Sequence, residues 1–202
     1  MKLVIIGAGG HAKVVADTAQ LAGWQVIGFV DNRLDATLFD LPHLGQPCDL
    51  ELPKDVQVVI AVGSNLMRKK LDLEFSNRFS WAKIIHPRAV ISRRVIIGIG
   101  TVVFAGAVIQ ADATIGQHCI VNTLAAVDHD CTVANYCHVA PNATLAGGVT
   151  IETGAFVGAG SIVTPNKRVG SWATLGAGGV SVKDLDPNET YVGIPARRFI
   201  PS

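Results

Sequence analysis

The second half of the chain is organised around an aliphatic residue at every sixth position. This series is unbroken over sixteen consecutive positions and contains only isoleucine, leucine and valine. Those three residue types make up about a quarter of an average sequence, so chance does not produce such a run. The series consists of Ile85, Ile91, Ile97, Val103, Ile109, Ile115, Val121, Val127, Val133, Val139, Leu145, Ile151, Val157, Val163, Val169 and Leu175.

A second position, four residues after each aliphatic one, is small or medium-sized in every unit except at Lys167. A six-residue unit of this kind suits a short strand that ends in a bend. Three units would form one triangular coil of eighteen residues, and successive coils would stack at about 4.8 Å, the usual strand spacing. The pattern therefore predicts a parallel β-helix of hexapeptide repeats over residues 83–180, with the aliphatic side chains inside the prism.

The first part of the chain, residues 1–82, has a different pattern in which apolar strands alternate with amphipathic helices. The strands are expected at 2–6, 24–30 and 56–62, with helices over 12–23 and 66–77. This alternation predicts a small α/β domain with a parallel sheet that resembles half of a Rossmann fold. Ligands of such sheets bind at the carboxyl ends of the strands. Residues 181–202 are expected to form a carboxyl-terminal tail.

A glycine-rich loop, Gly7-Ala8-Gly9-Gly10-His11, follows the first expected strand, and Asp31 follows the second. The loop fits a dinucleotide fingerprint, with Asp31 as a ribose-binding acid. A domain of this length holds at most half of the strands of a dinucleotide cleft, which favours a mononucleotide or nucleotide sugar. Loop amides and the helix amino terminus would hold its diphosphate, with His11 within reach. A glycine turn without a ligand stays an alternative.

Composition excludes some functions. The net charge of +1 does not indicate nucleic-acid binding. The hydrophobic fraction is 49%, yet no apolar run is long enough for a membrane span, and the first residues lack the pattern of a signal peptide. A cytoplasmic protein is therefore expected. Cys119, Cys131 and Cys137 occupy the small inward position, so we expect neither disulfides nor a metal site from them.

The run Asp128-His129-Asp130 places an imidazole between two carboxylates. A neighbouring carboxylate orients the ring and raises its basicity, as a general base near neutral pH requires. An exposed turn histidine without a role is the alternative. His138 lies nine residues further on, half a coil away and therefore on another side of the prism. The two histidines could meet only between subunits, which predicts a homotrimer with three equivalent sites.

A zinc site formed by His118, His129 and His138 is an alternative function for these histidines. Their spacing does not bring them together on a β-helix, so no metal is expected. We expect no role for His118.

The combined pattern resembles the bacterial nucleotide-sugar acetyltransferases grouped with the sialic acid O-acetyltransferase family, and among them the enzymes that N-acetylate UDP-linked 4-amino sugars of the bacillosamine type. The motifs behind this resemblance are Gly7-Ala8-Gly9-Gly10-His11, Phe29-Val30-Asp31-Asn32, Ile60-Ala61-Val62-Gly63-Ser64-Asn65, Arg68-Lys69-Lys70, Asn122-Thr123, Asp128-His129-Asp130-Cys131, Cys137-His138-Val139 and Val192-Gly193-Ile194-Pro195-Ala196-Arg197-Arg198.

The resemblance implies a left-handed β-helix, with His129 as the catalytic base and Asp130 as the acid that tunes it. It implies a nucleotide-sugar site formed by the 7–11 loop with Asp31, Asn32 and Gly63. For acetyl-CoA it implies His138, Ala159 and Ala177, with the tail helping to cover the cofactor. Asn32 stands where the family commonly has a second acid, and Ser64 where it has an amide. These departures leave uridine or guanosine open.

The sequence, with this resemblance, thus predicts the transfer of an acetyl group from acetyl-CoA to the 4-amino group of a nucleotide-linked amino-deoxy sugar. The expected nucleotide is UDP, and the transfer is expected to be direct, within a ternary complex. The alternatives are O-acetylation of sialic acid, a GDP-linked amino sugar as acceptor, a binding module without catalysis, and an NAD-dependent role for the first domain.

Overall fold

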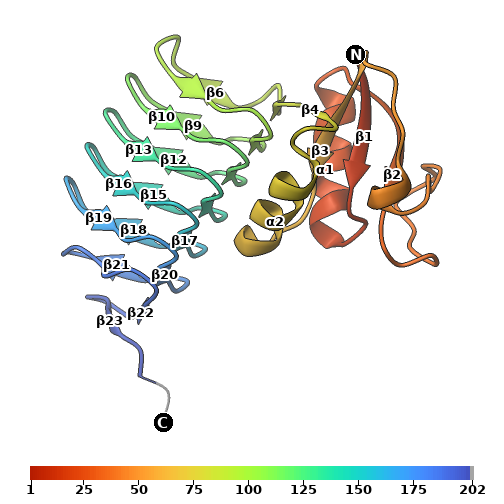
Figure 1. The fold of residues 1–202 in the computed structure, drawn as a ribbon. Helices are drawn as coiled ribbons and strands as arrows, with labels where there is room; N and C mark the ends of the chain where they lie inside the picture. The colour runs from red at the N-terminus through yellow and green to blue at the C-terminus, as the bar shows by residue number, and fades with distance from the viewer. Residues whose placement is uncertain (201–202) are drawn as a thin grey trace. The chain divides into compact units, whose positions relative to one another are not determined.

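The computed structural model describes residues 1–200, and the chain divides into two compact units, residues 1–87 and residues 88–202 (Figure 1). Each unit has its own arrangement of strands. The first is an α/β sheet and the second a parallel β-helix, which confirms the predicted fold class.

The first unit is built on a four-stranded parallel sheet in the order β2-β1-β3-β4. Its elements are β1 (Lys2–Ile6), α1 (Gly10–Leu21), β2 (Gln25–Val30), the 3-10 turn η1 (Pro47–Asp49), β3 (Val56–Ile60), α2 (Asn65–Phe75), β4 (Ser80–Trp81) and the short β5 (Ile84–Ile85). Strand β1 lies at the centre of the sheet. The carboxyl end of β1 therefore lies between the carboxyl ends of β2 and β3. The glycine-rich loop begins at this end of β1.

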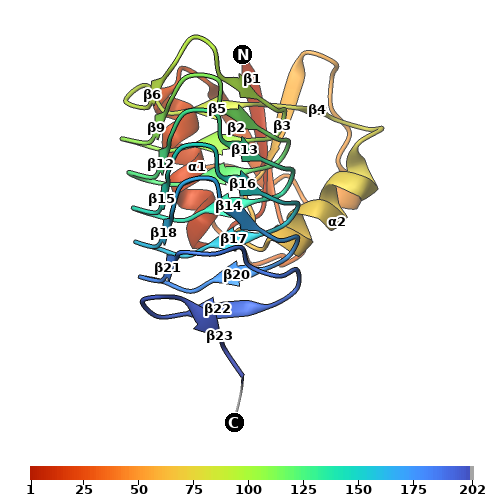
Figure 2. The same ribbon diagram turned by 90° about the vertical axis from the view of Figure 1, so that its left-hand side faces the viewer.

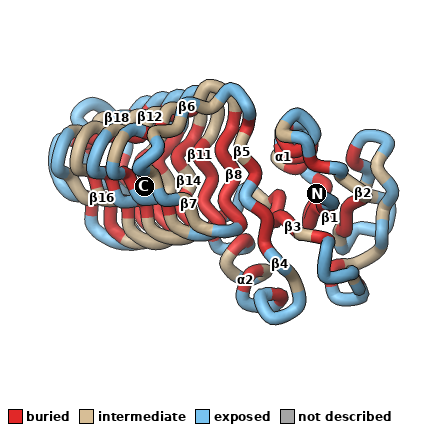
Figure 3. Tube along the Cα trace, turned by 90° about the horizontal axis from the view of Figure 1, so that it is seen from above, coloured by how far each residue is buried: buried red, intermediate tan, exposed pale blue. Residues whose placement is uncertain are grey.

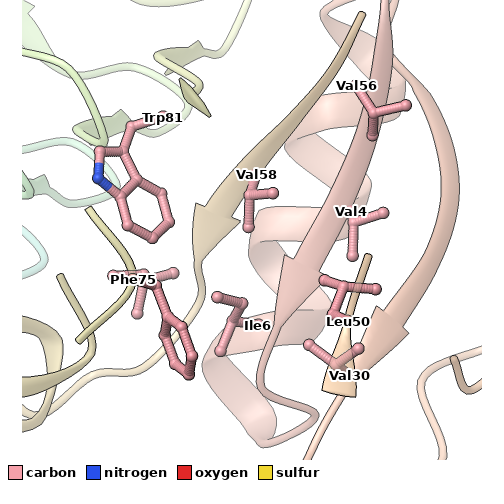
Figure 4. Packing of buried hydrophobic residues seen from close by; sticks show 9 residues of the cluster. Val4, Ile6, Val30, Leu50, Val56, Val58, Phe75 and Trp81 are labelled. Atoms are coloured by element: carbon pink, nitrogen blue, oxygen red, sulfur yellow. The ribbon is translucent and has the colours of Figure 1, made fainter. Parts of the chain in front are cut away.

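The sheet is buried on both faces, because all residues of β1 after Lys2 are buried. Successive side chains of a strand point to opposite faces. Val4 and Ile6 pack with Val58 of β3, Phe75 of α2 and Trp81 in one apolar cluster (Figure 4). Burial on both faces explains why this strand reads as a continuous apolar run.

Both helices begin slightly earlier than their sequence patterns suggest. The predicted 12–23 and 66–77 become α1 (Gly10–Leu21) and α2 (Asn65–Phe75). The hydroxyl of Ser64 accepts a hydrogen bond from the Met67 amide at 3.3 Å, so it caps α2 and starts the helix at Asn65. Gly23, with φ of 82°, adopts the left-handed conformation that ends helices such as α1.

The second unit consists of two-residue strands that recur every six residues and form three parallel sheets. We call them face B (β8, β11, β14, β17, β20, β22), face C (β6, β9, β12, β15, β18, β21) and face D (β7, β10, β13, β16, β19). Their bounds are β6 (Val90–Ile91), β7 (Ile96–Ile97), β8 (Val102–Val103), β9 (Val108–Ile109), β10 (Thr114–Ile115), β11 (Ile120–Val121), β12 (Ala126–Val127), β13 (Thr132–Val133), β14 (His138–Val139), β15 (Thr144–Leu145), β16 (Thr150–Ile151), β17 (Phe156–Val157), β18 (Ile162–Val163), β19 (Arg168–Val169), β20 (Thr174–Leu175), β21 (Val180–Ser181) and β22 (Thr190–Val192).

The coil repeat is eighteen residues, as predicted. On face D, for example, Thr114 pairs with Thr132, and on face B Ile120 pairs with His138. Figure 2 shows the strands of faces B and C as two columns of stacked coils. The left-handed coil direction implied by the resemblance stays a prediction.

The predicted inward series forms the core of the prism. From Val103 to Leu175 each of its members is at most 1% exposed, whereas Ile91 and Ile97 in the first coil are only partly buried. Figure 3 shows buried segments that recur from one coil to the next. Core packing along the stack, together with the strand hydrogen bonds between coils, therefore stabilises this unit.

The small inward position contributes hydrogen bonds as well as space. The thiols of Cys119, Cys131 and Cys137 donate to carbonyl oxygens fifteen residues later, at 3.0, 3.2 and 3.0 Å, and the Thr101 hydroxyl does the same at 2.7 Å. All three cysteines are buried and free of disulfides. The interpretation of these cysteines as inward packing residues is confirmed.

The corners have a regularity that the sequence analysis missed. Every sixth residue from Gly100 to Gly178 has a positive φ, between 52° and 72°. Each lies three positions after an inward aliphatic residue. Glycine, asparagine and aspartate tolerate this left-handed conformation and dominate the series, but Leu124, Tyr136 and Trp172 also occupy it. Asp130 is one of these corner residues, with φ of 59°.

The last coil is shorter than the others. Thr174 pairs with Thr190 and Val169 with Leu185, a step of sixteen residues. Strand β23 (Arg197–Arg198) then pairs antiparallel with β22. The expected tail at 181–202 thus contributes strands to the stack in its described part, and whether it covers a cofactor stays a prediction.

Two leucines of the β-helix provide a matched test of this packing. Leu145 is fully buried, and Leu124 at a corner is 57% exposed. We expect Leu145→Ala to lower the free energy of unfolding by about 2–5 kcal/mol, because it leaves a cavity in the prism. Leu124→Ala should change it by less than about 1 kcal/mol. Urea denaturation measures both, and equal losses would contradict the assignment of the inward series.

Candidate active site

The glycine-rich loop connects β1 to α1 and is tied to the end of β2. The Gly7 amide donates to the Val30 carbonyl at 2.8 Å, and the Ala8 amide donates to Oδ2 of Asp31 at 2.9 Å. Gly7 has φ of 106°, a conformation that favours glycine. Asp31 therefore has a structural task, because its carboxylate holds the loop next to the sheet.

Other glycines of the predicted nucleotide site are not required by the chain itself. A Cβ atom added at Gly9, Gly10 or Gly63 would meet no atom within 4 Å, and none of the three has a positive φ. The absence of a side chain keeps the backbone amides of the loop and of the α1 amino terminus open. Such amides form a site for anions, including a diphosphate.

Two hollows flank the loop within the first unit. One, of about 210 Å³, lies at the carboxyl ends of the strands and is lined mainly by apolar side chains, with Asp31 and Asn32 among its polar members. The other, of about 380 Å³, includes Gly9, Gly10, Lys13 and Arg33. The second hollow is polar, with Asp35 beside the two cations, and Arg33 is paired with Asp31. An apolar cleft beside a polar one suits a base and a phosphate group, and the sequence analysis missed Lys13 and Arg33.

The charge on Asp31 is stabilised locally. Burial alone would raise the pKa of Asp31, but hydrogen bonds from the Arg33 side chain and backbone and from the Ala8 amide outweigh it and lower the pKa. The Arg33 Nε lies 3.1 Å from Oδ1. Asp31 is thus an anion whose oxygens already accept several hydrogen bonds.

His11 lies in the first turn of α1, near the buried Arg68 of α2. Arg68 is 1% exposed and donates to the carbonyls of Val62 and Gly63 at 3.1 and 2.9 Å and to Oδ1 of Asn65 at 2.8 Å. Burial, together with the charge of Arg68, lowers the pKa of His11 to about 4. His11 is therefore neutral at pH 7, and Arg68 fixes the loop that follows β3.

His129 lies at the corner between faces C and D, after β12. Its Nδ1 is 2.7 Å from Oδ2 of Asp130, and its backbone amide donates to Oδ1 of Asp128 at 2.8 Å. The hydrogen bond to Asp130 and the charge of Asp128 raise the pKa of His129 above its ordinary value. The side chain is 61% exposed. The bend at Asp130 thus brings the acid to the ring, as the predicted pair requires.

His138 lies on face B, on the outward-facing position of β14. Its Nε2 is 3.0 Å from Nδ2 of Asn122, and its ring meets the edge of Phe156 at 5.1 Å. The Asn122 Oδ1 accepts the Thr123 amide at 2.8 Å, so Nδ2 must face His138. Because Nδ2 is a donor, Nε2 of His138 accepts. The sequence analysis named Asn122 only as part of a family motif, and the contact with His138 gives it a place in the site.

Ala159 and Ala177 lie on successive coils at the corner between faces B and C, and both are exposed. Both alanines therefore lie at the edge where face B ends, and face B is the face that carries His138. His129 occupies the corner opposite face B. Within one chain the structure does not bring His129 together with His138, Ala159 and Ala177.

The three histidines weighed as zinc ligands also stay apart. His118 is fully buried at the corner between faces D and B and stacks on Tyr136 at 5.8 Å. Within residues 1–200 no cluster of three or more histidine, cysteine or acidic side chains could hold a metal ion. In the same range no helix has the length and apolarity needed to cross a bilayer.

A nucleotide-type α/β unit and a β-helix with an acid-paired corner histidine define the class of hexapeptide-repeat acetyltransferases. Comparison with known proteins narrows this class. The family described as the PglD N-terminal domain matches residues 2–72. PerB from Caulobacter crescentus, solved in complex with CoA and GDP-perosamine, is 39% identical with a TM-score of 0.94, over 99% of this chain and 98% of that one.

The acetyltransferase domain of PglB from Neisseria gonorrhoeae FA1090, solved with acetyl coenzyme A, is 37% identical with a TM-score of 0.94, over 98% of each chain. The UDP-N-acetylbacillosamine N-acetyltransferase of Bacillus subtilis (strain 168) is 38% identical over 117 residues, 51% of each protein, so the match spans about half of that relative. The chain belongs to the PglD-type hexapeptide-repeat sugar N-acetyltransferases, which confirms the predicted family.

The low pKa of His11 predicts a specific response to acid. The folded-state pKa of about 4 lies below the ordinary value of 6.5. The stability that the neutral His11 side chain contributes is therefore complete above pH 6.5 and is lost as the pH falls toward 4. Between pH 7.5 and pH 5 this loss should amount to about 2 kcal/mol. Urea denaturation of the wild type and of His11→Asn at both pH values measures it. An identical pH dependence in the two proteins would contradict the assignment.

Proposed function

We propose that this chain transfers the acetyl group of acetyl-CoA to the amino group of a nucleotide-linked 4-amino sugar. The observation behind the proposal is the exposed imidazole of His129, hydrogen-bonded to Asp130 at 2.7 Å on a β-helix of this family. Relatives over nearly the whole chain are described with CoA or acetyl-CoA and with GDP-perosamine. The glycine-rich loop supplies the diphosphate site that such an acceptor needs.

The pairing with Asp130 decides which nitrogen of His129 reacts. The carboxylate accepts the Nδ1 proton, so Nε2 of the neutral ring has a free lone pair. Nε2 takes a proton from the sugar amine as the amine nitrogen attacks the thioester carbonyl carbon. When the carbon–sulfur bond breaks, the protonated Nε2 can return the proton to the departing thiolate. The carboxylates of Asp130 and Asp128 stabilise the imidazolium formed between the two steps.

A covalent acetyl-cysteine route does not fit the β-helix. Burial raises the pKa of Cys131 and Cys137, so neither thiol is ionised near neutral pH. Their sulfur atoms also point into the prism. Direct transfer between two bound substrates is the remaining route for this unit.

The residue Asn32 favours uridine over guanosine as the base of the proposed acceptor. The Asn32 carboxamide at the rim of the apolar cleft offers one donor and one acceptor, which matches the imide edge of uracil. The N1 and N2 donors of guanine pair better with a carboxylate. Asp31, the carboxylate beside Asn32, already accepts hydrogen bonds from Ala8 and Arg33. A UDP sugar is therefore the proposed acceptor, with a GDP sugar as the second candidate because of the perosamine relatives.

The separation of His129 from His138 supports a site shared between copies of the chain. The two lie on opposite sides of the prism, so one acetyl group can contact both only if they belong to different chains. Face C offers an apolar contact surface: its outward residues include Val90, which is 64% exposed, and Ile162, which is 41% exposed. Three prisms side by side would form three equivalent sites.

The activity is tested by an assay with acetyl-CoA and a panel of UDP-linked and GDP-linked 4-amino sugars, with a 4-hydroxy sugar as control. His129→Gln should lower kcat by about 10²–10⁴-fold, the usual contribution of a general base. Circular dichroism and calorimetric binding of acetyl-CoA confirm that the variant is intact. A kcat within a few-fold of wild type would rule out His129 as the base, and acetylation of the hydroxyl control alone would rule out N-acetylation.

Complementation tests the shared site. His129→Ala and His138→Ala are each expected to have low activity. If each site combines His129 of one chain with His138 of another, mixed trimers should regain roughly a third of wild-type activity, because one of their three sites receives both histidines. Co-expression with two affinity tags isolates the mixed species. Mixed trimers no more active than the single variants would contradict a site between chains.

A further inference from the structure

We infer that Gly147 is a positioning residue: because it has no side chain, the His129 imidazole can lie over its Cα atom and stay against Asp130. The inference rests on the proposed function in so far as it concerns turnover. Gly147 follows His129 by eighteen residues, one coil. Strands β12 and β15 pair Ala126 with Thr144, so residue 147 occupies the corner position directly next to residue 129.

The fold itself does not require glycine at this position. The equivalent corner residues of the other coils are Arg93, Ala111, His129, Pro165 and Lys183, and all of them have side chains. Gly147 also lacks a positive φ, unlike its neighbour Gly148 at 71°. The reason for glycine must therefore lie in what packs against it.

The His129 ring occupies the space that a side chain at residue 147 would fill. A Cβ atom added to Gly147 would lie 2.6 Å from both Nε2 and Cε1 of His129 and 3.3 Å from Nδ1. Contacts below 3 Å are shorter than van der Waals distances allow, so the ring would have to move. Glycine at residue 147 thus lets the imidazole lie directly against the backbone of the next coil.

A displaced ring would lose its partner. The short Asp130 side chain reaches Nδ1 at 2.7 Å from a corner residue with a fixed conformation, so it has little freedom to follow. The ring is 61% exposed and can turn into solvent at small cost in stability. An added methyl group should therefore separate the imidazole from Asp130 while the β-helix stays intact.

The charged groups around the ring allow a measurement that does not depend on activity. Asp130 and Asp128 face His129, and both raise its pKa, the first chiefly through the hydrogen bond. Asp112, the corner residue one coil before Asp130, is paired with Arg94 at 2.6 Å. Loss of the Asp130 hydrogen bond should consequently appear as a lower His129 pKa.

The experiment compares Gly147→Ala with wild type, by NMR titration of the imidazole protons and by steady-state kinetics. We expect the His129 pKa to fall toward that of Asp130→Asn, the reference without the carboxylate. Asparagine suits the left-handed corner, so this reference keeps the backbone. In Gly147→Ala, kcat should fall at least ten-fold, while the unfolding midpoint and the KM for acetyl-CoA stay close to wild type.

Two controls separate the possible outcomes. Ala111→Gly changes one methyl group at the equivalent corner of the preceding coil and should leave the His129 pKa and kcat unchanged. His129→Gln reports on the proposed function alone. If Gly147→Ala leaves the His129 pKa at its wild-type value, the inference is wrong whatever the activity. If the pKa falls while His129→Gln keeps its activity, Gly147 positions the ring and the general-base proposal fails instead.

Discussion

The stacking of aliphatic side chains at intervals of eighteen residues governs the rest of the β-helix. From Val103 to Leu175 these side chains are shielded from water by the coils above and below. Because a slip of one residue would turn them outward, burial of this series fixes the register of every strand. Residues eighteen apart therefore become neighbours, and residues six apart lie on successive faces. The positions of His129, Gly147 and His138 are consequences of this rule.

Because the core lies inside the prism, side chains at its corners and on its outer faces can take part in chemistry. A corner residue contributes its backbone conformation to the fold and leaves its side chain in solvent. Asp130 shows both roles, since aspartate tolerates the left-handed corner and its carboxylate lies 2.7 Å from His129. In the first unit Asp31 combines the roles differently: it is an anion at the rim of a cleft and the group that holds the glycine-rich loop.

The sequence predicted the architecture well because the period of six is uninterrupted and all sixteen positions of the main inward series are aliphatic. It predicted the His129–Asp130 pair because the two are adjacent in sequence. It did not predict the corner conformation, because Leu124, Tyr136 and Trp172 obscure the preference for glycine and asparagine. Gly147 could have been found by adding one coil to His129. The burial of Arg68 could not, because within the motif Arg68-Lys69-Lys70 nothing distinguishes the buried residue from its two lysine neighbours.

The shortened final coil has a consequence for the length of the assembly. A stack of identical coils is a one-dimensional array whose last strands expose unpaired amides and carbonyls, and such edges invite another chain to continue the array. Here β22 arrives after sixteen residues instead of eighteen, and β23 runs back along it in the opposite direction. An incoming parallel coil finds that edge of face B already occupied. The parallel order of face B thus ends at β22, and a further parallel coil would meet an antiparallel strand instead.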